Sequence, residues 1–201
     1  LNRAAQNGVQ VSEQVRARVE KNAQARYDHK SGKFKAGSSA GVELYASGAS
    51  LAQMQDSDNT SRDKLPELKM LAKEGRTESE RQYAQTRIQE IATNATALEA
   101  AKAAIVAKAA DGKFIAGFGS NGGEEFLSYM NIGESLVVNG GDAWEKWDKQ
   151  TSENLNHIQN TDGSWSGHHC ITGRSFCTAA ALLVLMTDRA PVPMAARVKG
   201  R

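Results

Sequence analysis

Long apolar stretches and an excess of one charge are both missing from this sequence. Its longest apolar run, residues 179–186, is far shorter than the roughly 18 residues that a membrane-spanning helix needs. Lys and Arg number 25 against 23 Asp and Glu, which leaves a net charge of +2, and the two signs are interspersed along the chain. The sequence therefore predicts neither a transmembrane segment nor a nucleic-acid partner.

Aromatic residues, cysteines and nucleotide-binding motifs are also scarce or missing. Aromatic residues make up 6% of the 201 residues and hydrophobic residues 40%, which is enough for one sizeable core or two small ones. The two cysteines, Cys170 and Cys177, allow one disulfide or a pair of thiols. No Walker-type loop or dinucleotide fingerprint is present. We interpret the Gly-rich residues 117–123 as a flexible corner, because no strand precedes them and they contain no lysine.

What the sequence does contain is a series of helical patterns separated by Gly-rich corners. Helices are expected over residues 12–27, from about 37 to 54, over 65–72, 78–108 and 122–138, from about 142 to 158, and over 176–185. Residues 56–63 look like a polar linker, and Pro66 is tolerated in the first turn of the helix after it. The sequence predicts an all-α protein with no β-sheet of consequence.

The helix over residues 78–108 is long and polar, with a thin apolar seam. The seam steps by 4, 3, 4, 3 and 7 residues, a coiled-coil spacing, through Ala84, Ile88, Ile91, Ala95, Leu98 and Ile105. Residues 60–108 are therefore a candidate helical insertion in a single domain of residues 1–201. The long helix would form a hairpin with residues 65–72, dock on a partner, or belong to the common core.

One corner of the chain is more specific than the rest. Gln159 ends a helix, Asp162-Gly163 forms a tight turn, and Trp165 follows directly. The Gln159 amide is suited to satisfying backbone groups at the helix end, and the Trp165 ring to covering the last turn. We expect Trp165 to be buried there. Trp144 and Trp147, three residues apart on the preceding helix, are read as core residues, with a ligand cavity as the alternative.

This corner resembles the glutamine–tryptophan repeat of the α/α-toroid proteins, which include squalene and hopene cyclases and the β subunits of protein prenyltransferases. Weaker copies of the corner lie at residues 24–34 and 110–114, and both contain Gly-Lys-Phe. The resemblance implies an α/α-toroid-like array of helical hairpins. Because the toroid enzymes are longer, this chain would form a partial ring or crescent.

The acidic and metal-binding motifs of these relatives are missing here. The closest match to the cyclase motif Asp-x-Asp-Asp is Asp56-Ser57-Asp58-Asn59, which lacks the last aspartate and falls in the expected linker. The prenyltransferase zinc ligands do not recur at their spacing, and the thioester motif Cys-Gly-Glu-Gln is absent. Aromatic residues are too few to line a carbocation cavity. We expect no cyclase activity.

Residues 168–177 bring together several chemically reactive side chains. Cys170 and Cys177 would form a disulfide, stay as thiols, or join His168 and His169 in a zinc or copper site. Arg174 would pair with a nearby acid such as Asp162 or build an anion site with the two histidines. We favour the disulfide, and with it a periplasmic or secreted location.

Three functions are consistent with these patterns. The first is a non-catalytic helical protein that binds another protein or assembles with itself. The second is an enzyme or carrier for an isoprenoid or other apolar ligand, as the resemblance implies. The third is a metal-binding module in residues 168–177. The missing catalytic motifs and the few aromatic residues favour the first, with no cofactor required.

Overall fold

The computed structural model describes residues 8–35, 39–118 and 121–189. Within these residues it has seven helices and one two-stranded sheet. The helices are α2 (Glu13–Gln24), α3 (Glu43–Glu74), α4 (Glu78–Lys108), α5 (Gly112–Ile115), α6 (Gly123–Val137), α7 (Gly141–His157) and α8 (Arg174–Leu185). The strands β1 (Tyr27–Asp28) and β2 (Lys33–Phe34) form a small antiparallel hairpin that pairs Tyr27 with Phe34. More than half of the chain is helical, so the all-α prediction is confirmed. None of the described helices is both long and apolar enough to cross a membrane.

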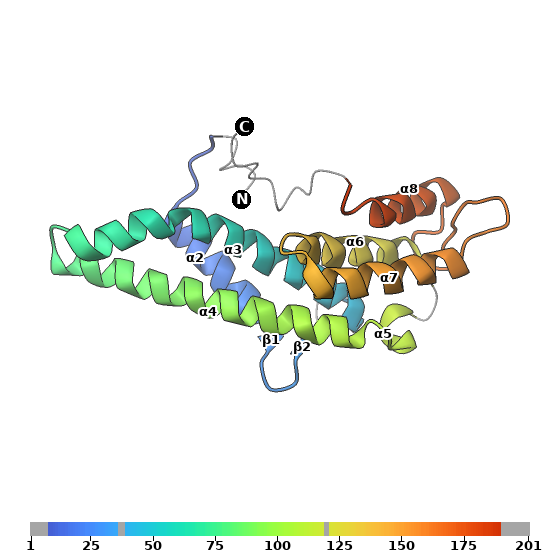
Figure 1. Ribbon diagram of the computed structural model, residues 1–201, viewed down its shortest axis with the longest axis horizontal. Helices are drawn as coiled ribbons and strands as arrows, with labels where there is room; N and C mark the ends of the chain where they lie inside the picture. Colours follow the sequence, from blue (N-terminus) through green and yellow to red (C-terminus); the bar gives the residue numbers. More distant parts are fainter. Residues whose placement is uncertain (1–7, 36–38, 119–120, 190–201) are drawn as a thin grey trace.

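The largest feature is the antiparallel hairpin of α3 and α4, which extends beyond α6, α7 and α8 at one end of the molecule (Figure 1). The turn between them is fixed by a reciprocal cap at the start of α4. Glu80 N donates to the Thr77 hydroxyl at 3.2 Å, and Thr77 N donates to the Glu80 carboxylate at 3.1 Å. Arg81 also donates to the Gly75 carbonyl at 2.6 Å. These bonds satisfy backbone groups that a helix end otherwise leaves without partners.

The predicted linker at residues 56–63 is wrong, because α3 continues through it and places Pro66 inside the helix. Polar residues in this segment bond to one another one helical turn apart. Gln55 donates to Asn59 at 2.9 Å, and Arg62 pairs with Asp58 at 2.6 Å. Asp58 is 1% exposed. Side-chain pairs at this spacing stabilise a helix even where the composition looks loop-like.

The bounds of α4 match the predicted helix, and its apolar seam packs against α3 in the same chain. Ala84, Ile91, Leu98 and Ile105 are at most 3% exposed, whereas Ile88 and Ala95 are half-buried. The partner of α4 in this hairpin is therefore α3 as a whole, and not residues 65–72 alone. The seam also belongs to the common core.

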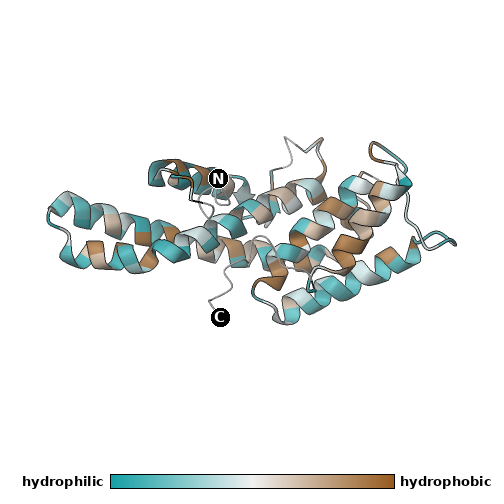
Figure 2. Cartoon of the chain, turned by 90° about the horizontal axis from the view of Figure 1, so that it is seen from above, coloured by the Kyte–Doolittle hydropathy of each residue, from teal (hydrophilic) through white to brown (hydrophobic). Residues whose placement is uncertain are grey.

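Helices α6 and α7 pack on one half of the hairpin, and α8 packs on α6 and α7 (Figure 1). The crossing of α3 and α6 is close at Gly48, where a Cβ would lie 3.1 Å from the Ser128 backbone. Tyr129 and Trp147 meet edge to face, with ring centroids 6.3 Å apart. Trp147 is 1% exposed and Trp144 packs against the core, so their reading as core residues is confirmed. Figure 2 shows apolar residues gathered where these helices meet the hairpin, whereas the far end is largely hydrophilic.

Candidate functional site

Hydrogen bonds close the corner after α7, with the Gln159 amide bonded inside the turn and not to the helix end. Gln159 Nε2 donates to the Gly163 carbonyl at 2.8 Å, and Asp162 accepts from Ser164 N at 3.1 Å. Gly163 has φ +83°, a conformation that favours glycine. Trp165 is 3% exposed, and its Nε1 donates to the Leu155 carbonyl at 2.9 Å in the last turns of α7. The predicted burial of Trp165 is confirmed.

The same corner is attached to α8. Trp165 N donates to the Thr178 hydroxyl at 3.0 Å, and Arg174, the first residue of α8, pairs with Asp162. Arg174 therefore forms the ion pair expected of it and does not join a histidine-lined anion site. The chain between these two attachments is a loop of residues 166–173.

Three glycines let this loop lie against the start of α6. A Cβ at Gly167 would approach the Ile171 carbonyl to 2.4 Å and Gly122 Cα to 3.1 Å, and one at Gly123 would meet the Ile171 side chain at 2.8 Å. Gly123 N donates to the Ile171 carbonyl at 3.2 Å. From the sequence we interpreted Gly122 and Gly123 as part of a flexible corner. In the structure they let the loop of residues 166–173 pack closely against α6. This packing sets His169 and Cys170 beside the first turn of α6.

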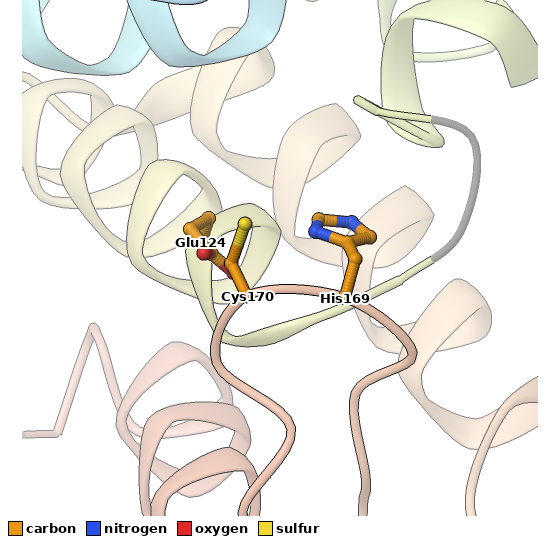
Figure 3. A group of neighbouring side chains, drawn as sticks. All are labelled: Glu124, His169 and Cys170. Atoms are coloured by element: carbon orange, nitrogen blue, oxygen red, sulfur yellow. The ribbon is translucent and has the colours of Figure 1, made fainter.

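At this point Glu124, His169 and Cys170 come together (Figure 3). One carboxylate oxygen, one ring nitrogen and the sulfur all lie within 4.8 Å of one another. The carboxylate comes from α6 and the other two groups from the loop. One ring nitrogen of His169 faces the Cys170 sulfur (Figure 3).

The neighbouring Glu125 is fully buried and fixed by three groups. Its Oε1 accepts from the Tyr45 hydroxyl of α3 and, at 3.1 Å, from Phe118 N. His169 Nε2 lies 3.4 Å from the same oxygen. Gly117, with φ +59°, makes room for this carboxylate, because a Cβ there would lie 2.4 Å from Oε1. Glu125 thus links α3, the loop before α6 and His169.

The two carboxylates make the site electronegative. The hydrogen bond and charge of Glu124 raise the pKa of the Cys170 thiol, with smaller contributions from burial and Glu125. Burial, followed by the hydrogen bond to Glu125, raises the pKa of Tyr45. Cys170 therefore acts as a donor to Glu124, and the site as a whole favours a cation over an anion.

The predicted disulfide between Cys170 and Cys177 is not formed in the structure, where both cysteines are free thiols. Cys170 is exposed beside Glu124, whereas the Cys177 sulfur is buried and donates to the Ile171 carbonyl at 3.4 Å. Each sulfur has its own partner, Glu124 for Cys170 and the Ile171 carbonyl for Cys177. The predicted periplasmic or secreted location was inferred from this disulfide and therefore has no support from the cysteines.

The structure assembles only part of the predicted metal or anion cluster. His169 and Cys170 meet, but His168 is exposed and Arg174 is engaged by Asp162. Glu124, Glu125 and Tyr45 are members that the sequence reading missed. The paired glutamates directly after Gly122-Gly123 were the available signal, because acids that begin a helix after a tight Gly-rich corner are held in place by it.

No protein-family model, curated protein or solved structure matches this chain.

Proposed function

We propose that this protein is a non-catalytic helical protein that assembles with a second copy of itself through the outer face of α8. The proposal is carried by four large apolar side chains on that face. Each is between 43% and 50% exposed: Phe176, Leu182, Leu183 and Met186.

Helix α8 is apolar on both sides. Its inner side chains, Cys177, Ala180, Ala181 and Val184, are at most 4% exposed in the core. No charged residue occurs from Ser175 to Thr187. A helix that is apolar all round is normally buried all round, and the described part of the chain covers only one side of it.

A second copy suits this face better than a charged partner. The face has no charged group to pair with one, and two identical uncharged faces meet without repulsion in a two-fold interface. Four half-exposed side chains per copy make a small contact area, so we expect weak association that depends on concentration.

The toroid resemblance adds a geometric proposal. In a ring of helical hairpins, each hairpin packs against the next. We propose that α7, the corner at residues 159–165 and α8 form one such hairpin, and that α8 of the second copy takes the place of the next hairpin. The attachment of Trp165 to both α7 and α8 supports this view of the segment as one unit.

The apolar-ligand alternative has less support. Phe126, Tyr129 and Trp147 are fully buried in contact with other core rings. The grooves beside α2 and at the hairpin turn are lined mainly by charged side chains such as Glu20, Arg87 and Glu74. Neither arrangement offers the aromatic-lined cavity that a carbocation enzyme needs.

Sedimentation velocity over a range of concentrations tests the assembly. The wild type should shift from monomer to dimer as concentration rises, and Met186→Lys should abolish the shift because it places a charge in the apolar contact. Met70→Lys is the matched control: Met70 is 59% exposed in the hairpin, away from α8, and its replacement should leave dimerisation intact. A wild type that stays monomeric, or equal loss in both variants, would refute the proposal.

A further inference from the structure

We propose that Glu124, His169 and Cys170 bind a zinc-class divalent metal ion, with Glu125 holding His169 in position. This inference is independent of self-assembly through α8. It differs from the cluster expected from sequence, since it includes two glutamates and leaves out His168, Arg174 and Cys177.

The spacing of the three ligands is close to what a metal requires. Zinc binds Cys sulfur, His nitrogen and carboxylate oxygen at about 2.0–2.3 Å, so neighbouring ligand atoms lie about 3–4 Å apart. The three atoms here already lie within 4.8 Å of one another. Contraction of about 1 Å, in a loop that can turn its side chains, would complete the site.

A carboxylate behind the histidine is the usual support for such a ligand. Glu125 Oε1 lies 3.4 Å from His169 Nε2 and is itself held by Tyr45 and by Phe118 N. Because Nε2 faces Glu125, Nδ1 is the ring nitrogen that would coordinate the metal. Glu125 is thus a positioning residue that fixes the orientation of the ring.

A second observation independently points to a cation. Glu125 is fully buried, and its Oε2 has no hydrogen-bond partner among the residues that the structure describes. A Cβ placed on Gly122 would lie 3.1 Å from this oxygen, 3.5 Å from Glu124 Oε2 and 3.6 Å from His169 Cε1. The absence of a side chain at Gly122 therefore leaves one point around which both carboxylates and the imidazole gather. A bound cation would compensate the buried oxygen.

The donor set selects the metal class. One sulfur, one imidazole nitrogen and one carboxylate oxygen suit zinc, whereas calcium and magnesium require oxygen ligands almost exclusively. On binding, the metal takes the place of the Cys170 proton, which is released to solvent. Three protein ligands leave a fourth position for water.

Titration of the full chain with Co²⁺, followed by Zn²⁺ displacement, tests the site. Co²⁺ should give a sulfur-to-metal charge-transfer band and intense visible bands of a four-coordinate site, and Zn²⁺ should abolish both. Cys170→Ser should eliminate the charge-transfer band, and His169→Gln should weaken binding at least about tenfold. The matched controls Cys177→Ser and His168→Gln should retain the band and the affinity.

Two further variants separate metal binding from general loss of structure. Glu125→Gln should keep the charge-transfer band but weaken Co²⁺ binding by about 10–100-fold, as expected when the support of a histidine ligand is removed. Gly122→Ala keeps every ligand and has an extended backbone that alanine accepts, but its methyl group fills the space between the two carboxylates and His169 and should also weaken binding. Each variant is checked for wild-type helicity by circular dichroism. Absence of the band in the wild type, or equal loss with His168→Gln and His169→Gln, would overturn the site.

Discussion

The two ends of the α3–α4 hairpin are stabilised in different ways. In the distal hairpin, residues 58–74 and 78–91, all of which the structure describes, Ala84 and Ile91 are the only buried apolar side chains. The helical base, formed by α6, α7 and α8 on residues 43–54 of α3, contains Phe126, Tyr129 and Trp147 in a dense core. Local bonds and caps maintain the distal hairpin, whereas tertiary packing maintains the base. Both candidate surfaces, the α8 face and the Glu124 site, belong to the base.

A buried polar contact joins the distal hairpin to α2. Glu20 of α2 accepts from Ser61 at 2.8 Å and lies 3.4 Å from Arg87. Arg87 and Glu20 are 6% and 2% exposed, so this buried contact joins α2 to α4 by charge and to α3 through the Ser61 hydroxyl. Such pairs specify how helices align more than they stabilise the fold. We therefore expect substitutions in the base to have the larger effects on stability.

The largest effect is expected in the base, from Trp165→Ala. The change removes a buried ring and its hydrogen bond to Leu155, and should lower the free energy of unfolding by about 3–5 kcal/mol. Urea unfolding followed by circular dichroism measures the loss. Trp165→Phe, which keeps most of the ring volume, should cost clearly less. A loss below about 1 kcal/mol for the alanine variant would show that the corner does not join α7 to α8 energetically.

A smaller loss is expected at the crossing of α3 and α6. Gly48→Ala forces a methyl group to 3.1 Å from the Ser128 backbone, and overpacking of this kind costs about 1–3 kcal/mol. Gly133→Ala is the matched control within α6, because its Cβ would only touch side chains at 3.4 Å. It should leave stability unchanged or raise it by up to about 1 kcal/mol through helix propensity. If the two variants unfold alike, the close crossing does not limit packing in the base.

In the distal hairpin, the cap of α4 should matter most. Thr77→Ala removes the acceptor for Glu80 N and should cost about 1 kcal/mol. Thr86→Ala, at an exposed position in the same helix, should change stability by less than about 0.5 kcal/mol. Thermal unfolding of the two variants side by side would distinguish them. Equal midpoints would mean that the Thr77 hydroxyl adds little and that the Glu80 carboxylate and Arg81 hold the turn.

The contrast between the two ends also explains what the sequence could predict. The bounds of α4, the buried seam and Trp165 follow from local spacing and turn chemistry. The helix through residues 56–63 was missed because its stability depends on polar pairs one turn apart, which composition alone reads as a linker. The Glu124 site was missed because its members come from α6, residues 166–173 and α3. Only tertiary packing brings Glu124, Glu125 and Tyr45 to His169. The disulfide prediction was not met for a related reason: two cysteines close in sequence can still direct their sulfurs to different partners.

The smallest expected effect is a pH dependence in the distal hairpin, at Asp58. Burial raises the pKa of this carboxyl above its ordinary value of 3.8, while the charges of Arg62 and Lys102 partly offset that rise and Glu99 adds to it. A carboxyl with a raised folded-state pKa stabilises the fold fully only below its unfolded pKa, and that contribution is lost as pH rises through the folded pKa. Asp58→Asn mimics the protonated form. At neutral pH the variant should therefore be as stable as the wild type or slightly more so. The difference should shift in favour of the wild type as pH falls toward about 4, because the wild-type carboxyl then takes up its proton. Urea unfolding of both proteins at pH 7 and pH 4 measures this shift. A variant that loses stability at pH 7 and recovers it in acid would show that the ion pair with Arg62 outweighs burial. The distal hairpin would then be stabilised by charge and not merely aligned by it.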